Sequence, residues 1–464
     1  MRCLYLLLPL LLIALPLSAD NGGVGITPEE QALILPIQSE DQIKLTPVKH
    51  IIIFYLENHS FDNLFGTFPG ADGLANAGEK TVQADVDGKP YKTLPAVMSD
   101  KKPDPRFPDN LPNKPFLISQ YVPANEKTGD LVHRFYQLQA QMDGGKMDKF
   151  AVVSDAGGLT MGYYDAKDSP IWQYAKKYTL ADHFFTAAFG GSYLNHLWLI
   201  CACTPHYADA PDSIRAKVDE KGNLIKDAPL TPDGYSVNTI EPLSPPYNKK
   251  AVDAEKRLPS QTMPTIGDRL SEKHIDWVWY SGGWRDADAG NPDKSFIYHH
   301  QPFAYFTNYA AGTQARKEHL KDESDFVVAI KKGDLPPVSF YKPIGEFDLH
   351  PGYSNLKNSQ EHVLGLISKI EHSALWKDSV IIVTFDDAGG FFDHVMPPKG
   401  DRFGPGERVP TLIISPFAKH GFIDHTTYDT TSILKFIESR FGLEPLADRD
   451  AKANNLGGSL EFRQ

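Results

Sequence analysis

The sequence predicts an α/β fold with a mainly parallel central sheet flanked by helices, and two observations carry this prediction. Short apolar runs recur along the chain, as expected of parallel strands that are buried on both faces. Stretches with a helical repeat lie between them, for instance at residues 359–376. Strands that alternate with helices indicate a parallel sheet. The predicted strands are residues 50–57, 276–281, 337–342, 379–387 and 410–417.

We expect one large domain with loop insertions, spanning residues 20–464. The chain has 464 residues, of which 41% are hydrophobic and 11% aromatic, enough for a sizeable core. Residues 101–116 are rich in Pro and Lys and are expected to form an irregular surface loop. Residues 206–259 hold scattered Pro, Asp and Lys with little periodicity, so we interpret them as an insertion and not as a second domain.

The N-terminus, residues 1–19, is typical of a secretory signal peptide. Arg2 precedes an apolar run at residues 4–17, and small residues follow at the expected cleavage point after residue 19. The alternative is an uncleaved anchor, but Pro9 and Pro16 interrupt the run, which is short for a membrane span. No later stretch is apolar enough to span a membrane. We therefore expect export to a periplasm or out of the cell, with no stable membrane span.

Charge and cysteine content narrow the possible partners. Without Arg2 the mature chain has 46 basic and 59 acidic residues, a formal net charge of −13, which argues against nucleic acid. An anionic substrate stays compatible with this net charge, because a site can concentrate positive charge or hold a metal.

Cys201 and Cys203 are the two cysteines that remain in the mature chain. A C-x-C disulfide closes a strained ring, so two buried thiols are expected instead. The sequence does not determine the oligomeric state.

Two of the predicted strands end in pairs of polar residues. Glu57 and Asn58 follow the first strand, and Asp386 and Asp387 follow the apolar run that begins at Ser379. Sites on parallel α/β sheets lie beyond the carboxyl ends of the strands, so these side chains are expected to form one oxygen-rich cluster. Adjacent carboxylates repel unless a cation joins them. We therefore predict a bound divalent metal; the alternative is that each pair caps a helix or turn.

A serine follows two glycines in the segment AFGGSYLNH, residues 188–196. Ser192 begins a helix-like pattern, where free backbone N–H groups can bind an anion. It is a candidate nucleophile, with helix N-capping as the alternative. The segment is not a G-x-S-x-G nucleophile elbow, because residue 194 is Leu. This argues against a lipase or esterase of that type.

Two histidines are candidates for contact with substrate. His133 and His350 lie among polar, Gly and Pro neighbours and not on apolar faces. Histidine can neutralise a phosphate oxygen or protonate a leaving group at mildly acidic pH. The alternative for each is a structural hydrogen-bonding role. His394, in the segment FFDH, is a weaker candidate.

Several segments together resemble a known family. The chain is similar to the bacterial phosphoesterase family of secreted acid phosphatases and phospholipases C, which are relatives of the alkaline phosphatase and sulfatase superfamily. The resemblance covers nearly the whole mature chain and implies an alkaline-phosphatase-like fold. It rests on YLENHSFDNLFGTFPGADG, DGGKMDKF, AFGGSYLNH, IGEFDLHPGYS, TFDDAGGFFDHVMPPKGDRFGPGERVPTLIISPF and YDTTSILKFIESRFGL, in this order.

The resemblance also implies roles for individual residues. It makes Ser192 the nucleophile of a phosphoserine mechanism and places His133 and His350 on the phosphate. It implies one divalent metal ion surrounded by Glu57, Asn58, Ser192, Asp386 and Asp387. Oxygen ligands favour Mg²⁺, Ca²⁺ or Mn²⁺, whereas related sites in the wider superfamily often use zinc. Family members can carry Glu at the position of Asp387, so whether this shorter side chain ligates or only supports stays open.

We expect a secreted, metal-dependent acid phosphatase that hydrolyses phosphate monoesters of small molecules. Residues 190–196, GGSYLNH, resemble the acid phosphatase form of the nucleophile segment and not the G-P-T/S-x-P-N-R form of the phospholipases C. Residues 298–310, YHHQPFAYFTNYA, agree with this. The alternative is a phospholipase C acting on phospholipid diesters. A third possibility, of another class, is a binding protein that holds a phosphate ligand without turnover.

Overall fold

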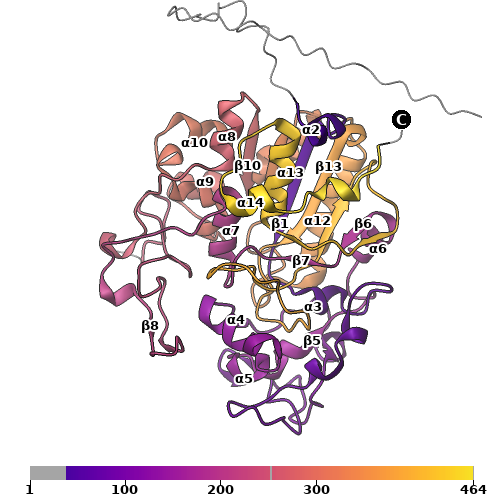
Figure 1. Cartoon of the computed structure of the whole chain (residues 1–464), viewed down its shortest axis with the longest axis vertical. Coiled ribbons are helices and arrows are strands. Elements are labelled where there is room, and N and C mark those ends of the chain that lie inside the picture. The colour runs from indigo at the N-terminus through magenta and orange to yellow at the C-terminus, as the bar shows by residue number, and fades with distance from the viewer. Residues whose placement is uncertain (1–37, 251–252, 463–464) are drawn as a thin grey trace, which may run out of the picture. The chain divides into compact units, whose positions relative to one another are not determined.

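An eight-stranded sheet, in the order β11-β10-β12-β1-β13-β14-β6-β15, forms the centre of the molecule (Figure 1). The structure is a computed structural model that describes residues 38–250 and 253–462. Ser39–Gln464 form one unit, and the predicted signal peptide lies outside the described residues. The strands of the sheet are β1 (His50–Leu56), β6 (Thr179–Ala181), β10 (Trp277–Ser281), β11 (Leu320–Asp322), β12 (Val338–Lys342), β13 (Ser379–Phe385), β14 (Thr411–Ile414) and β15 (Phe422–Asp424).

The predicted α/β class and the mainly parallel sheet are confirmed. Each of the five predicted strands corresponds to a strand of this sheet. Neighbouring strands from β11 to β13 are parallel, as are β6 and β15. One expectation is wrong: β14 runs antiparallel to both β13 and β6. All four residues of β14 are buried, and a strand buried on both faces has the same apolar pattern in either direction.

An α-helix directly follows four of the eight strands of the sheet, β1, β10, β11 and β12, in agreement with the alternating pattern. In Figure 1, α2 lies at the end of the sheet where β1 begins, whereas α3 lies at the opposite end together with α4 and α5. The predicted helix at residues 359–376 is α12, which begins earlier and ends earlier. The α-helices are α2 (Glu40–Lys44), α3 (Phe61–Phe65), α4 (Phe135–Met142), α5 (Phe150–Val153), α6 (Trp172–Lys177), α7 (Ser192–Cys201), α8 (Ile266–Glu272), α9 (Trp284–Asp288), α10 (Gln314–His319), α11 (Glu323–Lys332), α12 (Leu356–Glu371), α13 (Thr431–Phe441) and α14 (Asp448–Lys452).

None of the helices in the described part of the chain is both long and apolar enough to cross a membrane.

Short two-stranded pairs complete the regular structure. The insertion predicted at residues 206–259 is largely irregular and contains one of the pairs. The remaining strands are β2 (Met98–Ser99), β3 (Lys102–Pro103), β4 (Phe116–Leu117), β5 (Gly162–Tyr163), β7 (Phe184–Phe185), β8 (Lys217–Val218), β9 (Leu224–Lys226) and β16 (Tyr428–Asp429).

The expectation of two free thiols at Cys201 and Cys203 is wrong, because they form a disulfide. Cys201 is the last residue of α7, and Ala202 adopts a left-handed conformation with φ of 48°. This turn ends the helix and brings the two Cα atoms to 5.1 Å, within the usual range for a disulfide.

The register of β1 and β13 positions the residues that follow them. Leu56 lies opposite Phe385 at the carboxyl ends of these two parallel strands. The chain continues in register, since the backbone N–H of Asp386 donates to the carbonyl of Leu56 at 2.9 Å. The polar pairs after the two strands therefore lie side by side.

Candidate active site

Four buried polar side chains meet at the carboxyl ends of β1 and β13, as predicted from the strand pattern. Glu57, Asn58, Asp386 and Asp387 are each at most 1% exposed. Asn58 Nδ2 lies 2.5 Å from Asp387 Oδ2 and 3.4 Å from Asp386 Oδ1. So many polar groups together in the core require compensation by hydrogen bonds or opposite charge.

Ser192 projects into this cluster from the first turn of α7. Its Oγ donates to Asp387 Oδ2 at 3.1 Å, lies 3.4 Å from Glu57 Oε2, and accepts from Asn58 Nδ2 at 3.1 Å. Gly191, and not Ser192, is the N-cap residue of the helix, so the capping alternative does not apply. Glycine is needed at 191 because a Cβ there would lie 2.8 Å from the His133 carbonyl oxygen.

The cluster fits a divalent ion. Ligands at adjacent corners of an octahedron around an ion at about 2.1 Å lie about 3 Å apart, close to the 3.1 and 3.4 Å from Ser192 Oγ to Asp387 and Glu57. Asn58 Oδ1 is buried with no hydrogen-bond partner among the described residues. Rotating this amide by half a turn exchanges its nitrogen and oxygen without changing its shape, and would point the oxygen toward the carboxylates as a metal ligand. Despite its short side chain, Asp387 reaches the other donors directly.

A buried lysine that the sequence analysis did not identify lies beside the carboxylates. Lys342, the last residue of β12, is fully buried, and its Nζ lies 2.8 Å from Glu57 Oε1 and 3.0 Å from Asp386 Oδ2. Burial alone would raise the pKa of Glu57, but the charge of Lys342 and the contact with His300 outweigh it and hold that pKa well below its ordinary value. The pKa of Asp386 is raised well above its ordinary value by burial and by the charge of Glu57.

Three histidines that the sequence analysis also missed surround the same group: His196 and His300, which are buried, and His299, which is partly exposed. His300 Nε2 contacts Glu57 Oε1, and His196 Nδ1 lies 3.5 Å from Asp386 Oδ2. The rings of His196 and His300 stack 5.5 Å apart, and His299 packs against both. Burial lowers the pKa of His300 to about 4 and the pKa values of His196 and His299 well below the ordinary value. These rings are therefore neutral near pH 7. In the sequence, only the dipeptides Asn195-His196 and His299-His300 indicated these three histidines.

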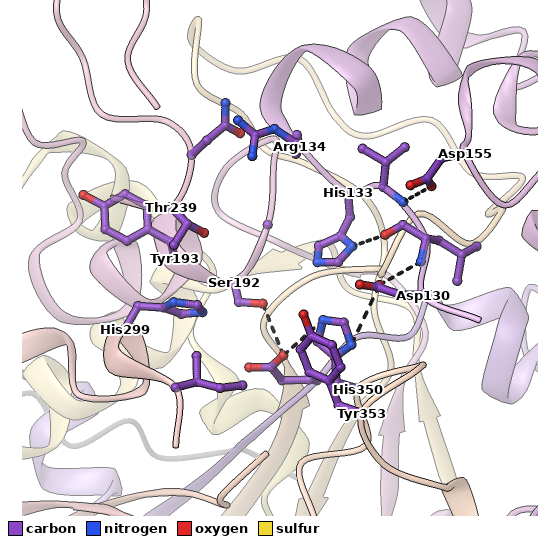
Figure 2. Close-up of a pocket in the computed structure, with 16 residues that line it drawn as sticks. Asp130, His133, Arg134, Asp155, Ser192, Tyr193, Thr239, His299, His350 and Tyr353 are labelled. Carbon is purple, nitrogen blue, oxygen red and sulfur yellow. Dashed lines mark hydrogen bonds and ion pairs between the residues drawn. The ribbon is translucent and has the colours of Figure 1, made fainter. Parts of the chain in front are cut away.

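His133 and His350 line the same cavity as Ser192 and lie on the same side of it in Figure 2. Their ring centres are 5.3 Å apart, and His350 Nε2 lies 3.8 Å from Glu57 Oε2. Burial lowers the pKa of His133, but the carboxylates of Asp387 and Asp130 outweigh it and raise that pKa above 6.5. A protonated ring at this place can neutralise an anion or donate a proton.

The cavity has a volume of about 360 Å³. It is lined by the predicted site residues Glu57, His133, Ser192 and His350 and by polar residues of several loops. Asp130, Asp155 and Tyr353 lie on the side of the two histidines (Figure 2). Asn238 and Thr239, from the insertion at residues 206–259, also line it. This insertion therefore contributes to the mouth of the site.

His394, the weaker candidate, does not line this cavity. Its Nδ1 lies 2.6 Å from Asp62 Oδ2 and its Nε2 lies 3.3 Å from Asp72 Oδ1. The carboxylate of Asp62 also pairs with the buried guanidinium of Arg408. The structure gives His394 a place in a buried charge network that joins α3 to the loop after β13.

Comparison with known proteins decides the family. A model of the family described as "Phosphoesterase family" matches residues 48–444. The chain belongs to the phosphoesterase family. Its members are hydrolases that act on phosphoric ester bonds, so this phosphoesterase is such an enzyme, and the predicted family is confirmed. Groups of side chains able to hold a metal ion are present, among them Glu57, His196 and Asp386.

The curated relatives of this phosphoesterase include bacterial phospholipases C. "Phospholipase C B" of Mycobacterium tuberculosis is 24% identical, over 90% of this chain and 78% of that protein. "Non-hemolytic phospholipase C" of Pseudomonas aeruginosa is 24% identical, over 95% of this chain and 62% of that protein. Among solved structures, a protein in the alkaline phosphatase superfamily from Vibrio parahaemolyticus aligns with a TM-score of 0.33 and 12% identity, over 71% of this chain and 73% of that one. A TM-score this low supports no inference about function.

Proposed function

We propose that this phosphoesterase is a metal-dependent phosphatase that hydrolyses phosphate monoesters through a phosphoserine at Ser192. One observation carries the proposal. Ser192 lines the cavity with its Oγ in contact with the carboxylates of Glu57 and Asp387, and His133 and His350 line the same cavity. A nucleophile, an acidic ligand set and two proton carriers are therefore together at one opening.

Glu57, Asn58, Ser192, Asp386 and Asp387 would hold one divalent ion. Such an ion lowers the pKa of a bound hydroxyl and offsets the negative charge of the carboxylates and the phosphate. The oxygen donors favour Mg²⁺, Ca²⁺ or Mn²⁺, and Zn²⁺ is compatible. Lys342 supports the same set, because its ammonium neutralises charge on two of the carboxylates without occupying the cavity.

The residues of the chain account for each step. Ser192 Oγ forms a bond to phosphorus as the bond to the alcohol oxygen breaks, and the serine proton passes to a neighbouring carboxylate. His133, whose pKa is raised, donates a proton to the leaving alcohol. Water then attacks the phosphoserine and gives one proton to His133. The bond between phosphorus and Ser192 Oγ breaks, Ser192 takes its proton back from the carboxylate, and phosphate leaves. His350 and the protonated His133 stabilise the negative oxygens of the phosphoryl group. Two in-line steps retain configuration at phosphorus.

The second candidate is a phospholipase C, an activity favoured by the curated relatives, which are phospholipases C. The choice of a phosphate monoester over a diester as substrate rests on the GGSYLNH segment, which resembles the acid phosphatase form. Turnover of p-nitrophenyl phosphate and of p-nitrophenyl phosphorylcholine separates the two. A higher kcat/KM for the monoester supports the phosphatase, and an equal or higher value for the diester refutes it.

We also propose that the protein is exported and acts on small phosphorylated molecules, not on nucleic acid. The signal-like N-terminus and the acidic net charge support this. The disulfide between Cys201 and Cys203 adds support, because disulfides persist mainly in oxidising compartments. Comparing the mass of the protein from cell extract and from periplasm or medium tests both cleavage and export.

Intact-mass spectrometry during turnover tests the nucleophile. Protein quenched in acid while it hydrolyses a monoester should gain the mass of one phosphoryl group, mapped to Ser192 and absent from Ser192→Ala. Ser359→Ala is the matched control, since Ser359 is fully buried and its hydroxyl has no hydrogen-bond partner among the described residues. Turnover that persists in Ser192→Ala would show that water attacks phosphorus directly. A wild type as inert as Ser192→Ala would instead favour a ligand-binding role.

A further inference from the structure

Three side chains away from the active site meet where two pairs of short strands join. Asp182 and His183 lie between β6 and β7, and His425 lies between β15 and β16. Because β6 pairs in parallel with β15, and β7 with β16, the two connections run side by side. One potential ligand atom from each of the three residues lies within 4.8 Å of the other two.

The buried carboxylate of Asp182 is the centre of this group. Its Oδ1 lies 2.9 Å from both His183 Nδ1 and His425 Nδ1, and its Oδ2 accepts from the backbone N–H of Asp72 at 2.8 Å. Arg408 donates to the backbone carbonyl of Asp182 and not to its carboxylate. The carboxylate is therefore held in a fixed orientation while both histidine rings face it.

His183 lies between two carboxylates. Its Nδ1 faces Asp182, and its Nε2 lies 3.3 Å from Asp72 Oδ2. A neutral imidazole carries one proton and can donate to only one of them, so the other nitrogen would present its lone pair to an acceptor. A cation at Nδ1 removes this conflict and leaves the Nε2 proton for Asp72. Metal-bound histidines commonly donate their second nitrogen to a carboxylate in this way.

We propose that Asp182, His183 and His425 bind a divalent transition-metal ion of the zinc type. Two imidazole nitrogens and one carboxylate oxygen are donors that zinc prefers. The nitrogen-to-oxygen separations of 2.9 Å are close to the roughly 3.0–3.4 Å between ligands around an ion at about 2.0–2.1 Å. The His425 side chain is 60% exposed, which leaves a path for the ion and a position for water. The ion ties together the two connections and shares no residue with the cluster at Ser192.

Zinc stoichiometry tests this site independently of activity. The untagged protein is stripped with a chelator, dialysed against Zn²⁺, and its bound zinc is counted by plasma mass spectrometry. Wild type should bind one more zinc per chain than His425→Gln or His425→Ala. His420→Ala is the matched control, because His420 is an exposed histidine nearby in the chain and outside the group. Equal zinc counts in wild type and both His425 variants would overturn the proposal. A second proton on His183 would then explain how its two nitrogens face the carboxylates of Asp182 and Asp72.

A copper spectrum identifies the donors. With Cu²⁺ as the probe, the electron paramagnetic resonance spectrum of wild type should contain a component with coupling to two imidazole nitrogens. That component should be lost in His425→Gln and kept in His420→Ala, whereas phosphoesterase turnover should be the same in all three. Identical spectra for wild type and His425→Gln would contradict the assignment even if the zinc counts differed.

Discussion

Lys342 offers the sharpest test of how the acidic cluster is stabilised. Replacing it in Lys342→Met keeps an unbranched chain of similar length and removes the charge. At 2.8 Å from Glu57, the contact with this ionised carboxylate is worth about 6 kcal/mol of Coulomb energy at an effective dielectric constant of ~20. The contact with Asp386 at 3.0 Å adds a similar energy only when that carboxyl, whose pKa is raised, is ionised. The desolvation of the buried lysine opposes most of this. Breaking a buried ion pair by removal of one partner typically costs about 3–5 kcal/mol, and we expect a loss in that range.

The loss should depend on metal, because Lys342 and a divalent ion neutralise the same carboxylates. We expect the full loss in the free energy of unfolding in the presence of a chelator, and a smaller loss when the protein is saturated with the divalent ion that supports its activity. Urea unfolding at pH 7, followed by circular dichroism, measures both. Ser339→Ala is the control, since Ser339 lies on the same strand, is fully buried, and has no hydrogen-bond partner among the described residues for its hydroxyl.

Two results would refute the reasoning. A loss below about 1 kcal/mol in chelator would mean that the carboxylates are protonated or hydrated without Lys342, because a truly uncompensated buried charge costs more. An equal loss with and without metal would mean that the lysine and the ion do not share the charge of Glu57 and Asp386.

Two further predictions concern pH. Asp130 helps to raise the pKa of His133, so Asp130→Asn should move the alkaline limb of the pH profile of kcat to lower pH. Activity on that limb should fall by about 2- to 5-fold, the effect of a partly exposed charge pair. Asp155→Asn, which changes another carboxylate of the cavity, should leave the limb in place, and identical shifts in both variants would contradict the assignment. Glu438 in α13 is 3% exposed, and burial and Asp450 raise its pKa from 4.5 to about 9. Its contribution to stability is present below pH 4.5 and is lost as pH rises through about 9. Glu438→Gln should therefore stabilise the protein by about 3–4 kcal/mol at pH 7, at ~1.4 kcal/mol per pH unit above 4.5, and by nothing at pH 4. Urea unfolding at both pH values, with the exposed Glu444→Gln as control, checks this, and an unchanged or lower stability at pH 7 would count against it.

Much of the architecture followed from local pattern. Strands such as β1 and β13 are apolar throughout because both faces of a parallel sheet are covered, so their positions and class could be predicted from composition and spacing. The polar pairs Glu57–Asn58 and Asp386–Asp387 stood out because they end such runs. The direction of β14 could not be predicted in this way, because burial on both faces has the same signature in either direction.

The sequence by itself determined five of the eight strands of the sheet, the family, and the residues Glu57, Asn58, Ser192, Asp386 and Asp387 as one group of candidates. Only the tertiary structure brought in Lys342, His196 and His300, because a Lys or His within a strand or helix has no distinguishing local pattern. Lys342 reaches the carboxylates through the strand order β10-β12-β1-β13, His196 through α7, and His300 through the short helix Tyr298–His300. Charge compensation depends on distance in space, and that distance is set by the fold as a whole.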